Sequence, residues 1–231
     1  MKKATASHSL SQQETLSGFI YLAFQFLCLP SLLRWCNRQF DFGLSTAELN
    51  FVFYLINFLA VILIFHNFLG HNLTQVTQHP AYFCQAVILG LFAYYACLWA
   101  VDWVMDLLTP GFSNYNDAAI ADMSRGSYFL MLVGTVILVP PAEECFFRGL
   151  VFRNLYGKSR WAAYVVSMLV FAAIHILGYI GMYSPLELCM AVLQYLPAGL
   201  CLAWAYTKAG TIFAPILIHA CINYLTIQRL R

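Results

Sequence analysis

Charged side chains are scarce in this 231-residue sequence, because Asp, Glu, Lys and Arg make up only 10% of it, whereas soluble domains carry about 25%. Hydrophobic residues account for 61% of the chain, and the mean hydropathy is +0.71. A soluble domain of this size cannot bury so much apolar surface. The composition therefore excludes a cytosolic or secreted globular protein and a disordered chain, and it indicates lipid as the solvent.

An excess of positive charge is also lacking. Twelve Lys and Arg stand against ten Asp and Glu, which gives a formal net charge of +2. Proteins that bind DNA or RNA need clustered Lys and Arg on one face. We therefore expect no nucleic acid among the partners of this protein.

Several catalytic motifs of membrane hydrolases are missing as well. The sequence contains no HExxH, the zinc-binding helix of many metalloproteases, and no GxSxG nucleophile elbow. Asp102 and Asp106 lie near the end of one apolar run, beside Trp99 and Trp103, where they are expected at the membrane interface, so no aspartate pair is embedded in the membrane. These absences exclude zincin-type, serine-elbow and aspartyl chemistry of the familiar kinds.

Long apolar runs are what the sequence does have. A helix needs about 20 residues to cross the hydrocarbon core of a bilayer. Seven runs approach this length: 19–33, 49–69, 83–108, 128–156, 161–179, 185–207 and 211–228. They predict an all-α fold, a polytopic bundle of about seven transmembrane helices, in an integral multi-pass membrane protein; in a bacterium this would be the cell membrane.

The chain divides into two parts according to where the candidate catalytic residues lie. Residues 1–127 comprise a polar N-terminal tail (1–16) and three transmembrane helices that carry no recognised motif. Residues 128–231 carry the buried polar groups and form the candidate catalytic core. A polar loop is expected over 109–127, between the two parts.

A proline pair interrupts the fourth apolar run. Pro140 and Pro141 stand directly before Glu143 and Glu144. Proline cannot donate a backbone hydrogen bond within a helix, so the pair predicts a kink or a break and restart at this point. A restart would place both glutamates near a helix N-terminus, where the helix dipole favours anions.

Ionisable groups are costly inside lipid, so each one at membrane depth is a functional candidate. The set, with one polar companion, is Glu143, Glu144, Arg148, His175, His219 and Asn223. Residues four apart share a helix face, so Glu144 and Arg148 should pair. Glu143, turned by about 100° from Glu144, is then the free carboxylate.

The same spacing groups the remaining candidates. Phe171 and His175 share one face of the fifth run, and His219 and Asn223 share one face of the seventh. A carboxylate with an imidazole can hold and deprotonate a water molecule. A second imidazole with an amide can donate hydrogen bonds to a developing oxyanion. These residues thus have the composition of a hydrolytic site in a dry pocket.

Other interpretations of the polar set stay open. Interhelical hydrogen bonds can serve only to hold helices together. Buried Glu and His also suit a transporter or proton relay, although no inverted repeat relates the two halves, as it does in many transporters. Two histidines with one or two glutamates could also ligate zinc.

Three motifs in order resemble a known family. Glu143-Glu144-Cys145-Phe146-Phe147-Arg148 fits EExxxR, Phe171 to His175 fits FxxxH, and His219 to Asn223 fits HxxxN. Each motif lies on a separate apolar run. Together they resemble the CPBP family of intramembrane proteases, also called the Abi or CAAX-protease family, over about residues 128–227.

The resemblance implies roles for these residues. It assigns water activation to Glu143 and His175, and the oxyanion hole to His219 and Asn223. Glu144, Arg148 and Phe171 take supporting roles. The resemblance favours a glutamate-based mechanism without a cofactor or metal, while zinc stays open.

The expected function is therefore an integral-membrane endopeptidase that cuts a peptide bond near the membrane face. Its partners would be the lipid bilayer and a peptide or protein substrate, for which lipidation or a membrane anchor stays open. The alternative is a non-enzymatic immunity or peptide-binding protein of the same family.

Overall fold

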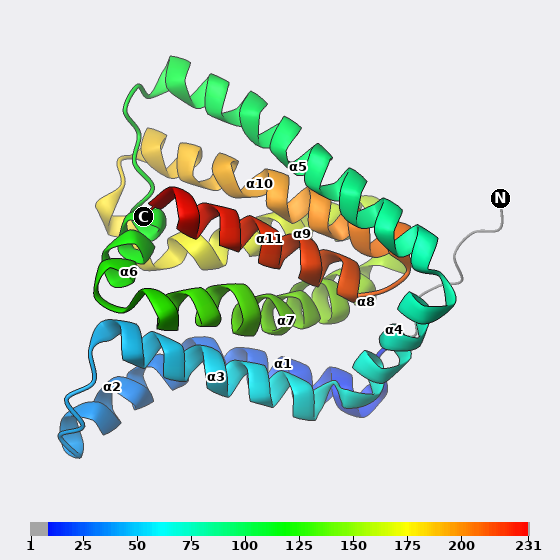
Figure 1. Ribbon diagram of the computed structural model, residues 1–231, viewed down its shortest axis with the longest axis horizontal. Coiled ribbons are helices and arrows are strands. Elements are labelled where there is room, and N and C mark those ends of the chain that lie inside the picture. The colour runs from blue at the N-terminus through cyan, green and yellow to red at the C-terminus, as the bar shows by residue number, and fades with distance from the viewer. Residues whose placement is uncertain (1–8, 231) are drawn as a thin grey trace.

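The computed structural model describes residues 9–230, and all regular structure within them is helical (Figure 1). The longer helices are α1 (Gln12–Leu27), α3 (Thr46–Ile64), α5 (Pro80–Leu108), α6 (Tyr115–Val133), α9 (Arg160–Ile176), α10 (Pro185–Ala209) and α11 (Phe213–Leu230). The shorter ones are α2 (Leu29–Gln39), α4 (His66–Gln78), α7 (Val139–Glu144) and α8 (Arg153–Tyr156), with the π-helical turns η1 (Gly134–Leu138) and η2 (Cys145–Phe152) and the 3-10 helix η3 (Leu177–Met182). The all-α prediction is confirmed.

Membrane-spanning length and hydropathy are met by five helices of the described residues, fewer than the seven predicted. They are α3, α5, the continuous stretch Tyr115–Tyr156, Arg160–Met182 and α10. The pair α1 and α2, bent by 51°, would make a sixth. The predicted seventh run forms α11, which is not among them, because His219, Asn223 and Arg229 lower its hydropathy. The polytopic membrane architecture is confirmed.

The outer surface of the bundle is apolar, as lipid requires. Large side chains that would be costly in water point outward from several spans, among them Leu63, Phe92, Trp99 and Trp161, each at least 74% exposed. Patches of this kind on a soluble protein would mark an interface or an aggregation site. Here they are the lipid-facing surface of an integral membrane protein.

Of the two alternatives expected at Pro140 and Pro141, a kink or a break and restart, the break and restart is wrong. Residues Tyr115–Tyr156 form one helical stretch of 42 residues. The prolines occupy the first turn of α7, directly after η1, where the N–H of Val139 donates to the carbonyl of Gly134. The wider π turn lets the helix continue where two donors are missing. Glu143 and Glu144 therefore lie in mid-helix, and no helix N-terminus compensates their charge.

Two boundaries drawn from polarity also need correction. Most of the predicted loop 109–127 is helical, because Asn114 caps α6 by accepting a hydrogen bond from the N–H of Asn116. The backbone departs from helical geometry at Ser127 instead (φ −152°, ψ 61°). The predicted tail 1–16 is helical from Gln12, where Ser11 caps α1. Residues 1–8 of that tail lie outside the described residues.

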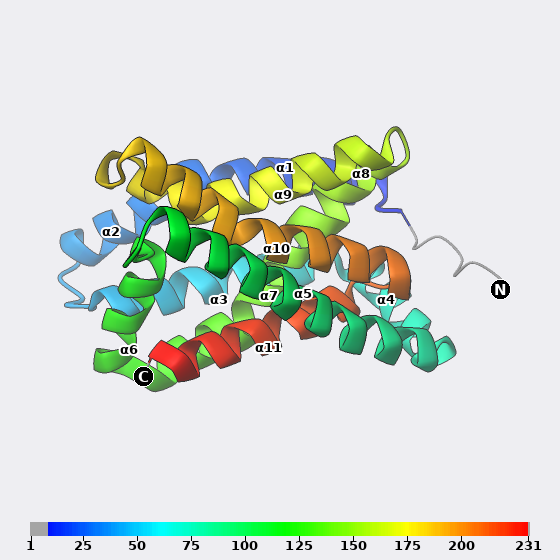
Figure 2. The ribbon, with the colours of Figure 1, turned by 90° about the horizontal axis from the view of Figure 1, so that it is seen from above.

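The motif-free helices pack against the segment that carries the candidate glutamates. Tyr21 of α1 stacks on Phe146 of η2 with the ring centroids 6.0 Å apart, and Phe65, between α3 and α4, meets the same ring edge-on at 5.7 Å. Figure 1 shows α1 and α3 on one side of α7 and α9, α10 and α11 on the other, and in Figure 2 α3 again lies beside α7. The first half of the chain thus forms one wall around the site.

Candidate active site

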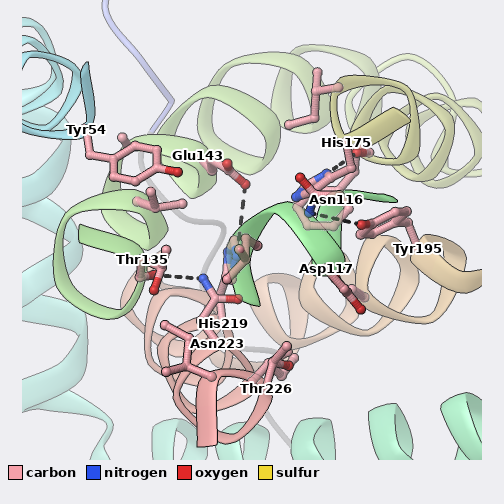
Figure 3. Close-up of a pocket in the computed structure, with 18 of the residues that line it drawn as sticks. Tyr54, Asn116, Asp117, Thr135, Glu143, His175, Tyr195, His219, Asn223 and Thr226 are labelled. Carbon is pink, nitrogen blue, oxygen red and sulfur yellow. Dashed lines mark hydrogen bonds and ion pairs between the residues drawn. The ribbon is translucent and has the colours of Figure 1, made fainter. Parts of the chain in front are cut away.

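Four side chains predicted to act together line one cavity of about 470 Å³ (Figure 3). Glu143 comes from α7, His175 from α9, and His219 and Asn223 from α11. Phe171 lines the same cavity. The helices that carry these residues are distant in sequence, so only the tertiary fold brings the groups together.

Glu144 and Arg148 lie behind the cavity wall and are fully buried. Oε1 of Glu144 accepts a hydrogen bond from Nη1 of Arg148 at 2.9 Å, so the predicted pair is confirmed. The guanidinium also lies 4.6 Å above the ring of Phe171. Its Nη2 donates to the carbonyls of Ala198 and Gly199 on α10 at 3.4 and 3.3 Å. Phe171 and α10 therefore hold the cation whose partner is Glu144.

Glu143 is the free carboxylate, as the helical spacing predicts. Its side chain is 24% exposed, and Oε2 lies 4.0 Å from Nε2 of His219. This oxygen is buried and accepts no hydrogen bond within the described residues. A buried carboxylate oxygen without a donor carries an unmet desolvation cost. A water molecule in the cavity would satisfy it.

His219 is held between the two glutamates. Its Nδ1 lies 2.9 Å from Oε1 of Glu144. The same oxygen accepts a hydrogen bond from Arg148, so it acts as an acceptor here, and Nδ1 carries a hydrogen and donates it. Nε2 then faces Glu143 and the cavity. It can donate a hydrogen bond only when the ring is an imidazolium, whose charge would balance Glu143, Glu144 and Arg148.

His175 is fixed by backbone and rings. Its Nδ1 lies 2.8 Å from the carbonyl of Phe171, which can only accept, so Nδ1 donates and Nε2 is the free nitrogen. The imidazole lies between the rings of Phe171 and Tyr195, with centroid distances of 4.7 and 4.5 Å. Within residues 9–230, no contact of 4.0 Å or less joins it to Glu143. The two can cooperate only through a bridging molecule.

Asn223 is anchored on the π turn. Its Nδ2 donates to the carbonyl of Thr135 in η1 at 2.8 Å, a contact drawn in Figure 3. One amide hydrogen is thereby used, and the second stays available. The π turn that accommodates the prolines therefore also orients a candidate oxyanion donor.

Sequence reasoning missed further residues that line the cavity. Tyr54 of α3 faces Glu143 in Figure 3, and Asn116 and Asp117 of α6 lie on the side away from it. Tyr54 fits there because Gly134 has no side chain: an added Cβ would lie 2.7 Å from its ring. No motif marks these positions, and their only signal is a polar side chain beside or within an apolar run.

Zinc was an open alternative at this site. Within the described residues, no three His, Cys, Asp or Glu side chains converge as a metal site requires. Nδ1 of His219 is bonded to Glu144 and Nδ1 of His175 to the carbonyl of Phe171, which leaves Nε2 of both rings without a hydrogen-bond partner among the described residues. The mechanism proposed below assigns no step to a metal.

Comparison with known proteins places the site within a family. Residues 125–225 match the family model described as type II CAAX prenyl endopeptidase, Rce1-like. Over this segment the chain is similar to the CAAX protease family. The matched segment contains every candidate residue from Glu143 to Asn223. This family of membrane proteases agrees with the resemblance given by the three motifs.

Two further comparisons give only a partial match to a known protein and none to a solved structure. A curated Escherichia coli protein, described as an uncharacterized 24.3 kDa protein, is 29% identical over 102 residues, which is 43% of each chain. The chain thus matches less than half of that relative's length. No solved structure gives a significant match. The activity of the whole protein is accordingly a proposal.

Proposed function

We propose that this protein is an integral-membrane endopeptidase that hydrolyses a peptide bond with a water molecule activated by Glu143 and His175. The observation that carries the proposal is the buried Oε2 of Glu143, which lacks a hydrogen-bond donor and faces a cavity bordered by two histidines and an asparagine. The CAAX protease domain supports the same reaction class.

The water would lie between Glu143 and His175. The carboxylate of Glu143 and Nε2 of His175 can each accept one of its hydrogens, which orients an oxygen lone pair toward the substrate carbonyl. As the water attacks, Glu143 takes its proton. The same carboxyl group then gives that proton to the departing amine, as a general acid-base residue does.

The oxyanion would be stabilised from α11. Nε2–H of a protonated His219 and the second amide hydrogen of Asn223 are the available donors. Donors fixed in advance in a water-poor site stabilise developing charge strongly. Glu144 and Arg148 would act indirectly: Glu144 orients His219, and Arg148 holds Glu144 in position.

Cleavage of peptides tests the proposal directly. The full chain, purified in detergent and reconstituted in liposomes, is incubated with a peptide library, and products are identified by mass spectrometry. Wild type and Asp106→Asn, an exposed carboxylate outside the cavity, should yield the same products. Glu143→Gln and His175→Ala should yield none while melting at the wild-type temperature.

The alternative is a non-enzymatic peptide-binding or immunity protein of the same family. In that case Glu143→Gln would retain the full biological effect, and no wild-type products would appear. A Glu143→Gln variant that cleaves at the wild-type rate would disprove the mechanism proposed here.

A further inference from the structure

One end of the cavity has a wall of aromatic rings around a carboxylate. Asp117 of α6 lines it together with Tyr94 of α5, Tyr179 of η3 and Tyr195 of α10. Figure 3 shows Asp117 and Tyr195 on the same side of the cavity, away from Tyr54. The two residues before Asp117 contact two of these tyrosines: Asn116 donates to the hydroxyl of Tyr195 at 3.2 Å, and the ring of Tyr115 stacks on that of Tyr179 with centroids 6.3 Å apart. The four side chains therefore form one local environment.

Asp117 has no partner of its own. Within residues 9–230 it makes no hydrogen bond and no ion pair, in contrast to its neighbour Asn116, which donates to the hydroxyl of Tyr195 at 3.2 Å. It does not serve as the helix cap either, because the side chain of Asn114 caps α6. The carboxylate is half-buried at the cavity wall, and no hydrogen-bond donor or cation of the protein replaces the water that it has lost.

The charged lining residues of the cavity are Asp102, Asp117, Glu143 and Arg229. Arg229 acts on Asp102 and on Tyr94, but within residues 9–230 it forms no ion pair with Asp117. Arg148 is buried behind the wall, where it pairs with Glu144. Asp117 is thus an uncompensated anion in a cavity that, on the proposed function, receives a peptide.

We propose that Asp117 and the rings of Tyr94, Tyr179 and Tyr195 form a subsite for a cationic side chain, Lys or Arg, of the peptide substrate. A carboxylate gives such a cation a charge-assisted hydrogen bond, and aromatic faces attract it through their electrons. This subsite rests on the proposed function, because it presumes that a peptide enters the cavity. It makes the protease selective for a basic residue near the cleaved bond.

A binding assay tests the subsite without requiring cleavage. The probes are fluorescein-labelled decapeptides of one apolar sequence that carry a single Lys at each of positions 2 to 9, together with the parent in which Lys is replaced by norleucine. Binding to full-length Glu143→Gln in detergent is followed by fluorescence anisotropy. At least one Lys peptide should bind about tenfold more tightly than the parent, as expected for one close charge pair.

Variants assign the preference to Asp117. In the same background, Asp117→Asn should abolish the tenfold gain, Asp117→Glu should keep most of it, and Asp117→Lys should favour the corresponding Glu peptide. Asp102→Asn is the matched control, since that carboxylate already has Arg229 nearby, and it should leave the preference intact. Thermal melts of each variant verify folding, and Asp117→Glu keeps the test decisive if Asp117→Asn does not fold.

The outcomes separate the subsite from the proposed function. Equal binding of Lys and norleucine peptides in every position, or a Lys preference that survives Asp117→Asn, would overturn the subsite. If the preference depends on Asp117 but wild type cleaves none of the peptides that Glu143→Gln binds, the subsite stands and the protease proposal fails. If wild type cleaves peptides with no preference for Lys or Arg, the protease proposal stands and the subsite proposal fails.

Discussion

Nδ1 of His219 lies 2.9 Å from Oε1 of Glu144, a residue 75 positions earlier in the chain. The same oxygen accepts from Arg148, and all three side chains are buried. The contact fixes α11 against α7 and fixes which imidazole nitrogen faces the cavity. Glu144 is therefore a positioning residue, and its loss should affect stability and catalysis together.

Replacement of Glu144 by Gln should destabilise the protein by about 3–5 kcal/mol, because it leaves the guanidinium of Arg148 buried without a counter-ion. Replacement of both residues, Glu144→Gln with Arg148→Met, should recover part of this loss. Chemical denaturation in detergent measures the four corners of the double-mutant cycle. Strictly additive losses would show that the pair is not coupled.

Asn223→Ala should lower the cleavage rate by about 100-fold or more, since it removes a proposed oxyanion donor. It should also cost about 1–3 kcal/mol of stability, because the bond to the carbonyl of Thr135 is lost. Thr135→Val is the control: it alters the side chain but keeps that backbone carbonyl. Rates and melting temperatures of both variants test this, and a comparable rate loss in Thr135→Val would contradict it.

Gly199→Ala should loosen the packing of α9 on α10. The added Cβ would lie 2.8 Å from Cα of Met168, a backbone atom that cannot move alone. We expect a loss of about 1–3 kcal/mol from this overpacking, whereas Gly70→Ala, in α4 with nothing within 4 Å, should gain about 0.5–1 kcal/mol. Thermal melts of the two variants side by side would reveal whether they move in opposite directions.

Metal removal should leave cleavage unchanged, because the described residues do not assemble a three-ligand site. The measurement is the initial rate before and after dialysis against 1,10-phenanthroline, with the metal content of the purified protein determined in parallel. A known zinc protease treated in the same way verifies the chelation. Loss of activity that is restored by added zinc would refute the metal-free mechanism.

Contacts between residues four positions apart on one helix were the part of the site that the sequence could predict. The spacing of four joined Glu144 to Arg148 and left Glu143 free, and both features are present. The contact from His219 to Glu144 spans two helices far apart in sequence, so no helical periodicity contains it. The roles of the catalytic residues themselves stay predictions.

The apolar runs predicted the helical membrane fold but overestimated the number of spans, because α11, which the seventh run forms, carries His219, Asn223 and Arg229, which lower its hydropathy. The proline pair does not end the helix, because the π turn before it accommodates the two missing backbone donors. No local sequence pattern predicts such a turn. Tyr54 and Asp117 were not identified because this wall of the cavity exists only after α3 has packed against α7, and α6 against α3 and α11.

The polar character of α11 bears on how the protein is made. The translocon inserts a helix into the bilayer more readily the more hydrophobic the helix is. The His, Asn and Arg residues of α11 therefore weaken its insertion. Its entry therefore depends on helices synthesised earlier, whose Glu144 carboxylate and Thr135 carbonyl offer partners for its polar groups. Since His219 and Asn223 both lie on α11, the proposed catalytic centre is incomplete in the nascent chain until this helix has docked.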